Sequence, residues 1–195
     1  FYKRYNKNDN LTFVSSATNW LRDGKRLNNI IELSKIIGKN DIIKLIGHCD
    51  IELPNNIIKY GYINNDIEMS NIIGTSDIFL SLFFRDAGSK VTCQAVQCQL
   101  PILYTSSCVL TELFEQSNCV LVNDYNDIDF LDNTPELNIN DLINGYNNIK
   151  SSYKNIINGY NNIKSSYKNI INNYQKRESY QETISNYFKI MRNLC

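Results

Sequence analysis

The feature that most constrains this chain is an alternation, over its first two thirds, of short apolar runs with segments of helical periodicity. The runs are apolar at consecutive positions, which is typical of strands that are buried on both faces. Strands of this kind, when helices separate them, form a parallel sheet that is covered on both sides. We therefore predict an α/β fold, a doubly wound, parallel, Rossmann-like sheet built with right-handed crossovers.

The expected elements follow one another along the chain. The strands are expected at 11–17, 41–47, 55–61, 77–83, 101–104 and 119–123, and the helices at 25–37, 65–73, 89–99 and 109–116. In such a sheet the ligand lies outside the carboxyl ends of the strands, where the strand order reverses. Functional side chains are therefore expected in the loops after the strands, at 16–25, 47–50, 61–65, 83–90 and 104–110.

Charge and hydropathy exclude several classes of function. The 195 residues include 20 basic and 20 acidic side chains, so the chain has no broad basic surface for nucleic acid or for an anionic membrane. No run approaches the roughly 18 apolar residues that a membrane span needs, and the first residues do not resemble a signal peptide. We expect a cytoplasmic protein.

The first residue is not Met, which suggests that a longer chain precedes it. The 30 Asn and 27 Ile residues indicate an AT-rich genome.

Cysteine and histidine give no sign of a metal site. The six cysteines form no C-x-x-C pair, and His48 is the only histidine, so neither a zinc site nor another metal or cofactor is expected. Reduced, structural cysteines fit a cytosolic compartment.

We expect His48 to be a solvated loop residue and Trp20 to pack in the core. The sequence contains no evident Ser/His/Asp or Cys/His arrangement for hydrolysis.

The C-terminal part carries an internal repeat. The segment NGYNNIKSSYKNII occupies 144–157 and occurs again, unchanged, at 158–171. Its Ile and Tyr residues recur at steps of four and three, which is the pattern of an apolar helical seam. Two interpretations remain open, a duplicated stretch of an ordinary C-terminal helix and a coiled-coil contact. We expect a Rossmann-like nucleotide-sugar-binding domain at 1–135 and a helical tail at 136–195.

The segment 81–104 is the place where the sequence leads us to look for chemistry. A strand ends near Phe84 and a helix begins near Ser89, and the free N–H groups of 89–91 form a site for a diphosphate. Gly88 permits close backbone approach, and Lys90 adds positive charge. Asp86 and Gln94 offer polar groups toward a sugar and a ribose, although an Asp before a helix is also a common cap.

Several segments match the motifs of one enzyme family in order. A loop Lys after the first strand corresponds to Lys25, and further matches are KLIG (44–47), NNIIKYGYI (55–63), SDIFLSLF (76–83), DAGSKVTCQAVQCQLP (86–101) and CVLTEL (108–113). From about Leu11 to Asp124 the sequence resembles the C-terminal, donor-binding half of retaining GT-B glycosyltransferases, the family that includes glycogen and sucrose synthases.

The resemblance implies a nucleotide-diphosphate sugar as donor substrate and transfer to an unknown acceptor with retention of configuration. It implies that Asp86 is catalytic and that Lys25 contacts the donor phosphates. Further binding positions are Gly88, Ser89, Lys90, Gln94 and Glu112. The acceptor of such enzymes sits on an N-terminal Rossmann half, which these residues lack, so we expect a partner half or self-association through the tail.

The sequence departs from the family's motifs at the expected site. Gln94 stands where the family has a second acid, Gln99 replaces a Gly, and the glycines near Cys108 are missing. These departures leave an alternative open, a degenerate, non-catalytic module that keeps the fold and acts through protein contacts or oligomerisation.

Overall fold

A computed structural model describes residues 10–85, 90–98, 100–107, 119–122, 134–151 and 153. The chain divides into two compact units, Phe1–Tyr153 and Lys154–Cys195, and all described residues lie in the first. The helix that begins at residue 139 therefore packs as part of the same unit as the sheet.

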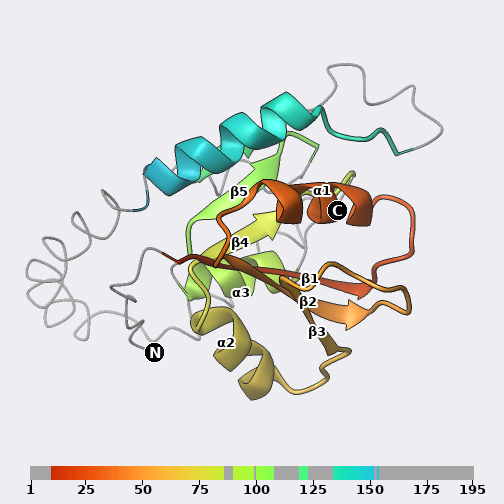
Figure 1. The fold of residues 1–195 in the computed structure, drawn as a ribbon. Helices are drawn as coiled ribbons and strands as arrows, with labels where there is room; N and C mark the ends of the chain where they lie inside the picture. Colours follow the sequence, from red (N-terminus) through yellow and green to blue (C-terminus); the bar gives the residue numbers. More distant parts are fainter. Residues whose placement is uncertain are drawn as a thin grey trace, which may run out of the picture. The chain divides into compact units, whose positions relative to one another are not determined.

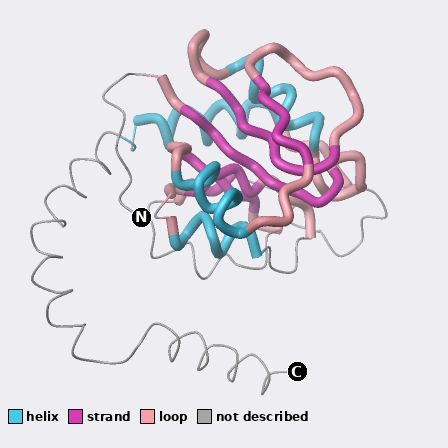
Figure 2. The backbone as a smooth tube through the Cα atoms, turned by 90° about the horizontal axis from the view of Figure 1, so that it is seen from below, coloured by secondary structure: helices cyan, strands magenta, loops and turns pink. Residues whose placement is uncertain are grey.

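The centre of the fold is a parallel sheet of six strands (Figures 1 and 2). Its order is β3-β2-β1-β4-β5-β6, and every neighbouring pair is parallel. This order confirms the predicted doubly wound α/β fold. The strand numbers fall from β3 to β1 across one half of the sheet and rise from β4 to β6 across the other, so the strand order reverses between β1 and β4. The strands are β1 Thr12–Asn19, β2 Ile42–His48, β3 Ile57–Gly61, β4 Ile78–Ser81, β5 Ile102–Thr105 and β6 Val120–Val122.

Helices cover both faces of the sheet. Helix α1 (Leu27–Ile36) and the helix over 139–151 lie on one face, whereas α2 (Asp66–Gly74) and α3 (Lys90–Gln97) lie on the other (Figure 1). None of the helices in the described ranges is long and apolar enough to cross a membrane. The helix predicted at 109–116 lies outside the described residues.

The core forms where strand side chains meet these helices. Beneath α2 and α3 the buried cluster consists of Val14, Ile46, Ile73, Phe79, Ala95, Leu100, Ile102 and Tyr104. Trp20 is 1% exposed and donates from Nε1 to the carbonyl oxygen of Ile46 at 2.8 Å. The core position predicted for Trp20 is therefore confirmed, and the hydrogen bond satisfies its only polar atom.

Two buried aspartates tie the amino ends of the central strands together. Asp41 precedes β2 and accepts from the backbone N–H of Leu11 at 2.7 Å. Asp77 precedes β4 and accepts from the N–H of Thr12 at 2.9 Å. Both carboxylates therefore fix the beginning of β1, and the opposite, carboxyl edge of the sheet is left to form the site.

The described residues of the first repeat copy, 144–151 and 153, lie against the sheet. Four residues of the predicted seam are nearly or fully buried: Leu142, Tyr146, Ile149 and Tyr153. The ring of Tyr146 packs against Phe13 of β1, with ring centroids 6.0 Å apart. The second copy, at 158–171, lies outside the described residues.

Candidate functional site

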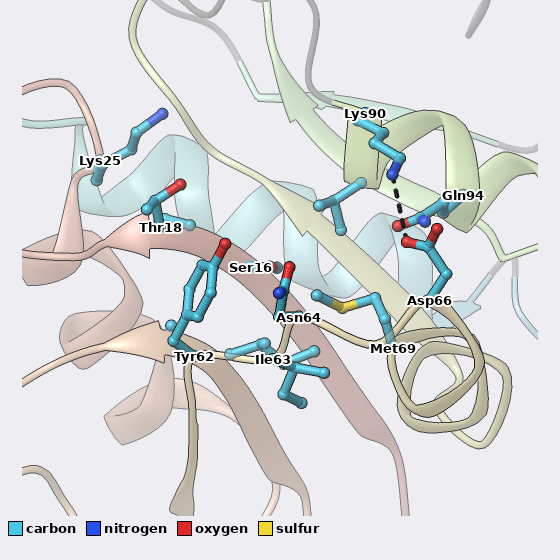
Figure 3. A pocket seen from close by; sticks show the side chains of 14 residues that line it. Ser16, Thr18, Lys25, Tyr62, Ile63, Asn64, Asp66, Met69, Lys90 and Gln94 are labelled. Carbon is cyan, nitrogen blue, oxygen red and sulfur yellow. Dashed lines mark hydrogen bonds and ion pairs between the residues drawn. The ribbon is translucent and has the colours of Figure 1, made fainter.

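A pocket of about 360 Å³ opens at the carboxyl edge of the sheet (Figure 3). Its walls come from the ends of β1 and β2, from the loop that carries Lys25, from the loop after β3, and from the amino-terminal parts of α2 and α3. Because β1 and β4 are neighbours at the reversal of strand order, the pocket stands where a doubly wound fold binds its ligand. Figure 3 labels the following lining residues: Ser16, Thr18, Lys25, Tyr62, Ile63, Asn64, Asp66, Met69, Lys90 and Gln94.

The pocket wall between β1 and β2 depends on a glycine. Gly47 has φ +121°, and a Cβ atom there would lie 1.7 Å from the carbonyl oxygen of Ala17. Only a residue without a side chain permits this approach. The sequence predicted a strand that ends in Gly47, and the structure shows that the close contact of two strand ends requires it.

Lys25 borders the pocket from the loop between β1 and α1. Its Nζ atom lies over the ring of Phe83, 4.7 Å from the centroid. The loop is shaped by left-handed backbone at Gly24 (φ +83°) and Arg26 (φ +50°). The carbonyl oxygen of Gly24 accepts from the N–H of Phe84 at 2.8 Å, so the segment after β4 holds the loop in place.

A segment far along the chain also holds the Lys25 loop. Buried Arg26 donates from Nε to the carbonyl oxygen of Pro135 at 3.0 Å. A side-chain hydrogen bond with Thr134 is the main cause that lowers the pKa of Asp23. Residues 134–135 are therefore positioning residues for the lysine, although the two segments are far apart in sequence.

An ion pair stands on the other side of the pocket, between α2 and α3. Lys90 Nζ lies 3.2 Å from Asp66 Oδ1, and both side chains are 76% exposed. Figure 3 shows Gln94 beside the carboxylate of Asp66. Because an exposed pair of this kind contributes at most about 1 kcal/mol, a ligand can displace it at little cost.

A flat aromatic surface lies at the end of the pocket nearest β3. Tyr62, which lines the pocket and is 53% exposed, stacks on His48 with centroids 5.3 Å apart and an interplanar angle of 2°. His48 is exposed, as expected, but it is the last residue of β2 and contacts Tyr62, so it is not an isolated loop residue.

Three of the predicted site residues meet in this pocket. Lys25 from the loop before α1 and two residues of α3, Lys90 and Gln94, all line it. The remaining predicted residues, Asp86, Gly88, Ser89 and Glu112, lie outside the described residues.

The prediction missed Asp66 and the aromatic side chain of Tyr62. Acidic residues are common in the first turn of a helix, so Asp66 could not be distinguished in the sequence from an ordinary helix-terminal residue. Tyr62 does follow directly on the Gly61 that ends β3, and this was the available clue.

The charges of the pocket favour an anion. Among the described lining residues, two lysines, Lys25 and Lys90, face one carboxylate, Asp66, and the first described turn of α3 borders the pocket. Within the described ranges no group of three His, Cys, Asp or Glu side chains could hold a metal ion. The arrangement can bind phosphate oxygens through ammonium groups and backbone N–H groups.

No protein-family model matches the sequence, and no curated protein matches it. The fold is nevertheless similar to that of solved glycosyltransferases. WaaG, a glycosyltransferase involved in lipopolysaccharide biosynthesis, has a TM-score of 0.50 and 15% identity, covering 76% of this chain and 44% of WaaG. Sucrose-phosphate synthase from Thermosynechococcus elongatus has a TM-score of 0.54 and 11% identity, covering 84% and 46%. The GtfA/B complex has a TM-score of 0.54 and 7% identity, covering 86% and 37%.

This likeness confirms the predicted resemblance at the level of the fold. The chain has the Rossmann-like α/β architecture found in GT-B glycosyltransferases. It spans less than half the length of these solved structures.

Proposed function

We propose that this chain is the donor-binding half of a glycosyltransferase and that its pocket binds a nucleotide-diphosphate sugar. The observation that carries the proposal is the placement of Lys25 and Lys90 on two sides of one pocket at the reversal of strand order. A diphosphate carries the negative charge that such a pair attracts. The fold shared with glycosyltransferases supports the same substrate class.

The donor's parts have distinct partners in this arrangement. The diphosphate lies between Lys25 and the amino end of α3, where Lys90 adds charge. The base lies toward Tyr62, whose exposed ring offers a stacking surface. Gln94 hydrogen-bonds the ribose, and Asp86 holds the hydroxyls of the sugar. Gly88, Ser89 and Glu112 complete the phosphate and sugar contacts.

Sugar transfer in this arrangement depends on positioning and electrostatics. Lys25 and the amino end of α3 stabilise the negative charge that develops on the departing diphosphate. The sugar is transferred with retention to an acceptor held by a separate N-terminal half. No metal or other cofactor is part of this proposal.

Calorimetric titration with nucleoside diphosphates tests the pocket directly. Lys25→Ala removes a charge-assisted contact of about 1.5–3 kcal/mol and should weaken binding about ten- to a hundredfold. Lys39→Ala is the matched control, because Lys39 is an exposed lysine between α1 and β2, outside the pocket. Equal effects of the two substitutions, or no binding to the folded protein at millimolar ligand, would refute the donor site.

Two further substitutions separate the sugar end of the site from the ribose end. Asp86→Ala should weaken nucleotide-sugar binding but leave the bare nucleoside diphosphate nearly unaffected. Gln94→Ala should weaken both ligands, because both contain the ribose. Gln94→Glu restores the acid of the resembling family and should keep or improve affinity. Equal losses for both ligands in Asp86→Ala would mean that Asp86 only caps the helix.

A second candidate function is a non-catalytic module that acts through protein contacts or oligomerisation. The observation that favours it is Gln94, an uncharged amide in the pocket where the resembling family has an acid. Sedimentation over a range of concentrations, with and without nucleoside diphosphates, distinguishes the two functions. A monomer at every concentration that binds the nucleotide would exclude self-association as the function.

A further inference from the structure

Two adjacent serines near the end of β1 differ in what their hydroxyls contact. Ser15 is buried, and its Oγ donates to the carbonyl oxygen of Leu80 in β4 at 2.7 Å. Ser16 is only 6% exposed, yet its hydroxyl makes no hydrogen bond to any residue in the described part of the chain. A buried hydroxyl without a partner costs free energy on folding, so its presence in a native structure requires an explanation.

The register of β1 shows where the Ser16 hydroxyl lies. Ser16 pairs with Ile46 of β2, and Val14, two residues earlier, belongs with Ile46 to the core cluster beneath α2 and α3. Because alternate residues of a strand share one face, Ser16 continues the face that carries Val14, whereas Ser15 points to the opposite face. Ser16 and Ile46 both line the pocket, so the core ends and the pocket begins at Ser16.

A second neutral polar group enters the pocket from the loop after β3. Asn64 lines the pocket, and its side-chain amide likewise forms no hydrogen bond with a described residue. Figure 3 shows Tyr62 and Asn64 extending from this loop into the pocket that Ser16 lines. Apolar side chains complete this lining: Ala17, Ile46, Ile63, Met69 and Val91.

These groups suit a flat, neutral ligand with hydrogen-bonding atoms at its edge. A hydroxyl and a primary amide both donate and accept hydrogen bonds, and neither carries a charge. A few such groups among apolar side chains fix the orientation of a bound ligand. A nucleobase has apolar faces that stack on aromatic side chains and an edge of donors and acceptors. Phosphate oxygens instead need positive charge, which Lys25 and Lys90 supply.

We propose that Ser16 and Asn64 bind the edge of the nucleobase and determine which base the pocket accepts. This inference rests on the proposed donor site and adds the residues that select its nucleoside. The base stacks on Tyr62, and its edge hydrogen-bonds the amide of Asn64 and the hydroxyl of Ser16. A pocket built to hydrogen-bond one pattern rejects a base that leaves these polar groups without partners.

Calorimetric titration with the ribonucleoside diphosphates of adenine, guanine, cytosine and uracil tests the selection. The ribose and the diphosphate are the same in these ligands, so a difference in affinity reports the base alone. The wild-type protein should prefer one base. Ser16→Ala should weaken the preferred ligand about two- to tenfold, as loss of a neutral hydrogen bond does, and weaken the others less. Asn64→Leu, which keeps the size but removes the amide, should reduce the same preference.

Ser15→Ala is the matched control, because it removes the neighbouring hydroxyl from the other face of β1. The contact with Leu80 is then lost, so the ratio of folded to unfolded protein in urea should fall about two- to tenfold. The affinity for every nucleotide should stay unchanged. Ser16→Ala should not lower this ratio, because the Ser16 hydroxyl has no partner to lose among the residues that the structure describes.

Three results would overturn the proposal while leaving the donor site in place, because nucleotide still binds in each. Unchanged affinities in Ser16→Ala would mean that the hydroxyl does not contact the ligand. An equal loss for all the ligands would place the contact on the ribose or the phosphates. Equal affinity of the wild-type protein for all of them would mean that the pocket selects no base. Absence of binding to both the wild-type protein and Ser15→Ala at millimolar ligand would instead refute the donor site, and this inference with it.

Discussion

Gly47 and Gly61 provide a matched pair of substitutions at the carboxyl ends of two neighbouring strands. Both have a positive φ, +121° at Gly47 and +67° at Gly61. A Cβ atom at Gly47 would lie 1.7 Å from the carbonyl oxygen of Ala17, whereas one at Gly61 would meet no atom within 4 Å. Alanine therefore adds backbone strain at both positions but a steric clash at only one of them.

The expected losses of stability follow from these geometries. Gly61→Ala places alanine in left-handed backbone, which costs about 1–2 kcal/mol, partly offset by the lower entropy of the unfolded chain. Gly47→Ala in addition displaces the end of β1. This displacement weakens the hydrogen bond of 2.9 Å from the backbone N–H of Trp20 to the carbonyl oxygen of His48. We expect a loss of at least about 3 kcal/mol for Gly47→Ala.

Urea unfolding measures both losses through a built-in probe. The chain has a single tryptophan, Trp20, which is buried next to Gly47 and hydrogen-bonded to Ile46. Its fluorescence should report the unfolding transition of the sheet. If Gly47→Ala lowers the free energy of unfolding by no more than Gly61→Ala does, the close approach of β1 and β2 is not a constraint on this fold.

Three further predictions use the same unfolding and titration assays. Burial lowers the pKa of Lys44, an effect that the charge of Asp77 partly opposes, so stability should rise with pH from the folded-state pKa toward 10.5. Lys44→Met should abolish this rise relative to wild type, and an unchanged pH slope would contradict the assignment. Asn65→Ala removes a side chain that caps two N–H groups of α2 and should cost about 1 kcal/mol of stability, whereas no change would contradict the cap. Asp66→Asn removes the carboxylate beside Lys90 and should strengthen nucleoside diphosphate binding about two- to fivefold, whereas weaker binding would mean that the ion pair organises the site.

The sequence was sufficient to predict the layout of the fold. Strands that are apolar on both faces are stable only when helices cover both sides of the sheet. This requirement predicted the parallel sheet and the succession of strands and helices along the chain. The position of the pocket at the carboxyl edge followed from the same layout, because loops after parallel strands gather at one edge. The assignment of Lys25 to this edge came from the family resemblance.

The contacts between distant elements were decided by the tertiary structure. The 3,4-spacing of Ile and Tyr identified an apolar helix face, but it could not say whether another helix or the sheet covers that face. The structure places Tyr146 and Tyr153 of that face on Asp41 and Asp77. Pairing of Lys90 with Asp66 is likewise invisible in sequence. Local periodicity records which side of an element is apolar, whereas its partner depends on how segments far apart along the chain meet in space.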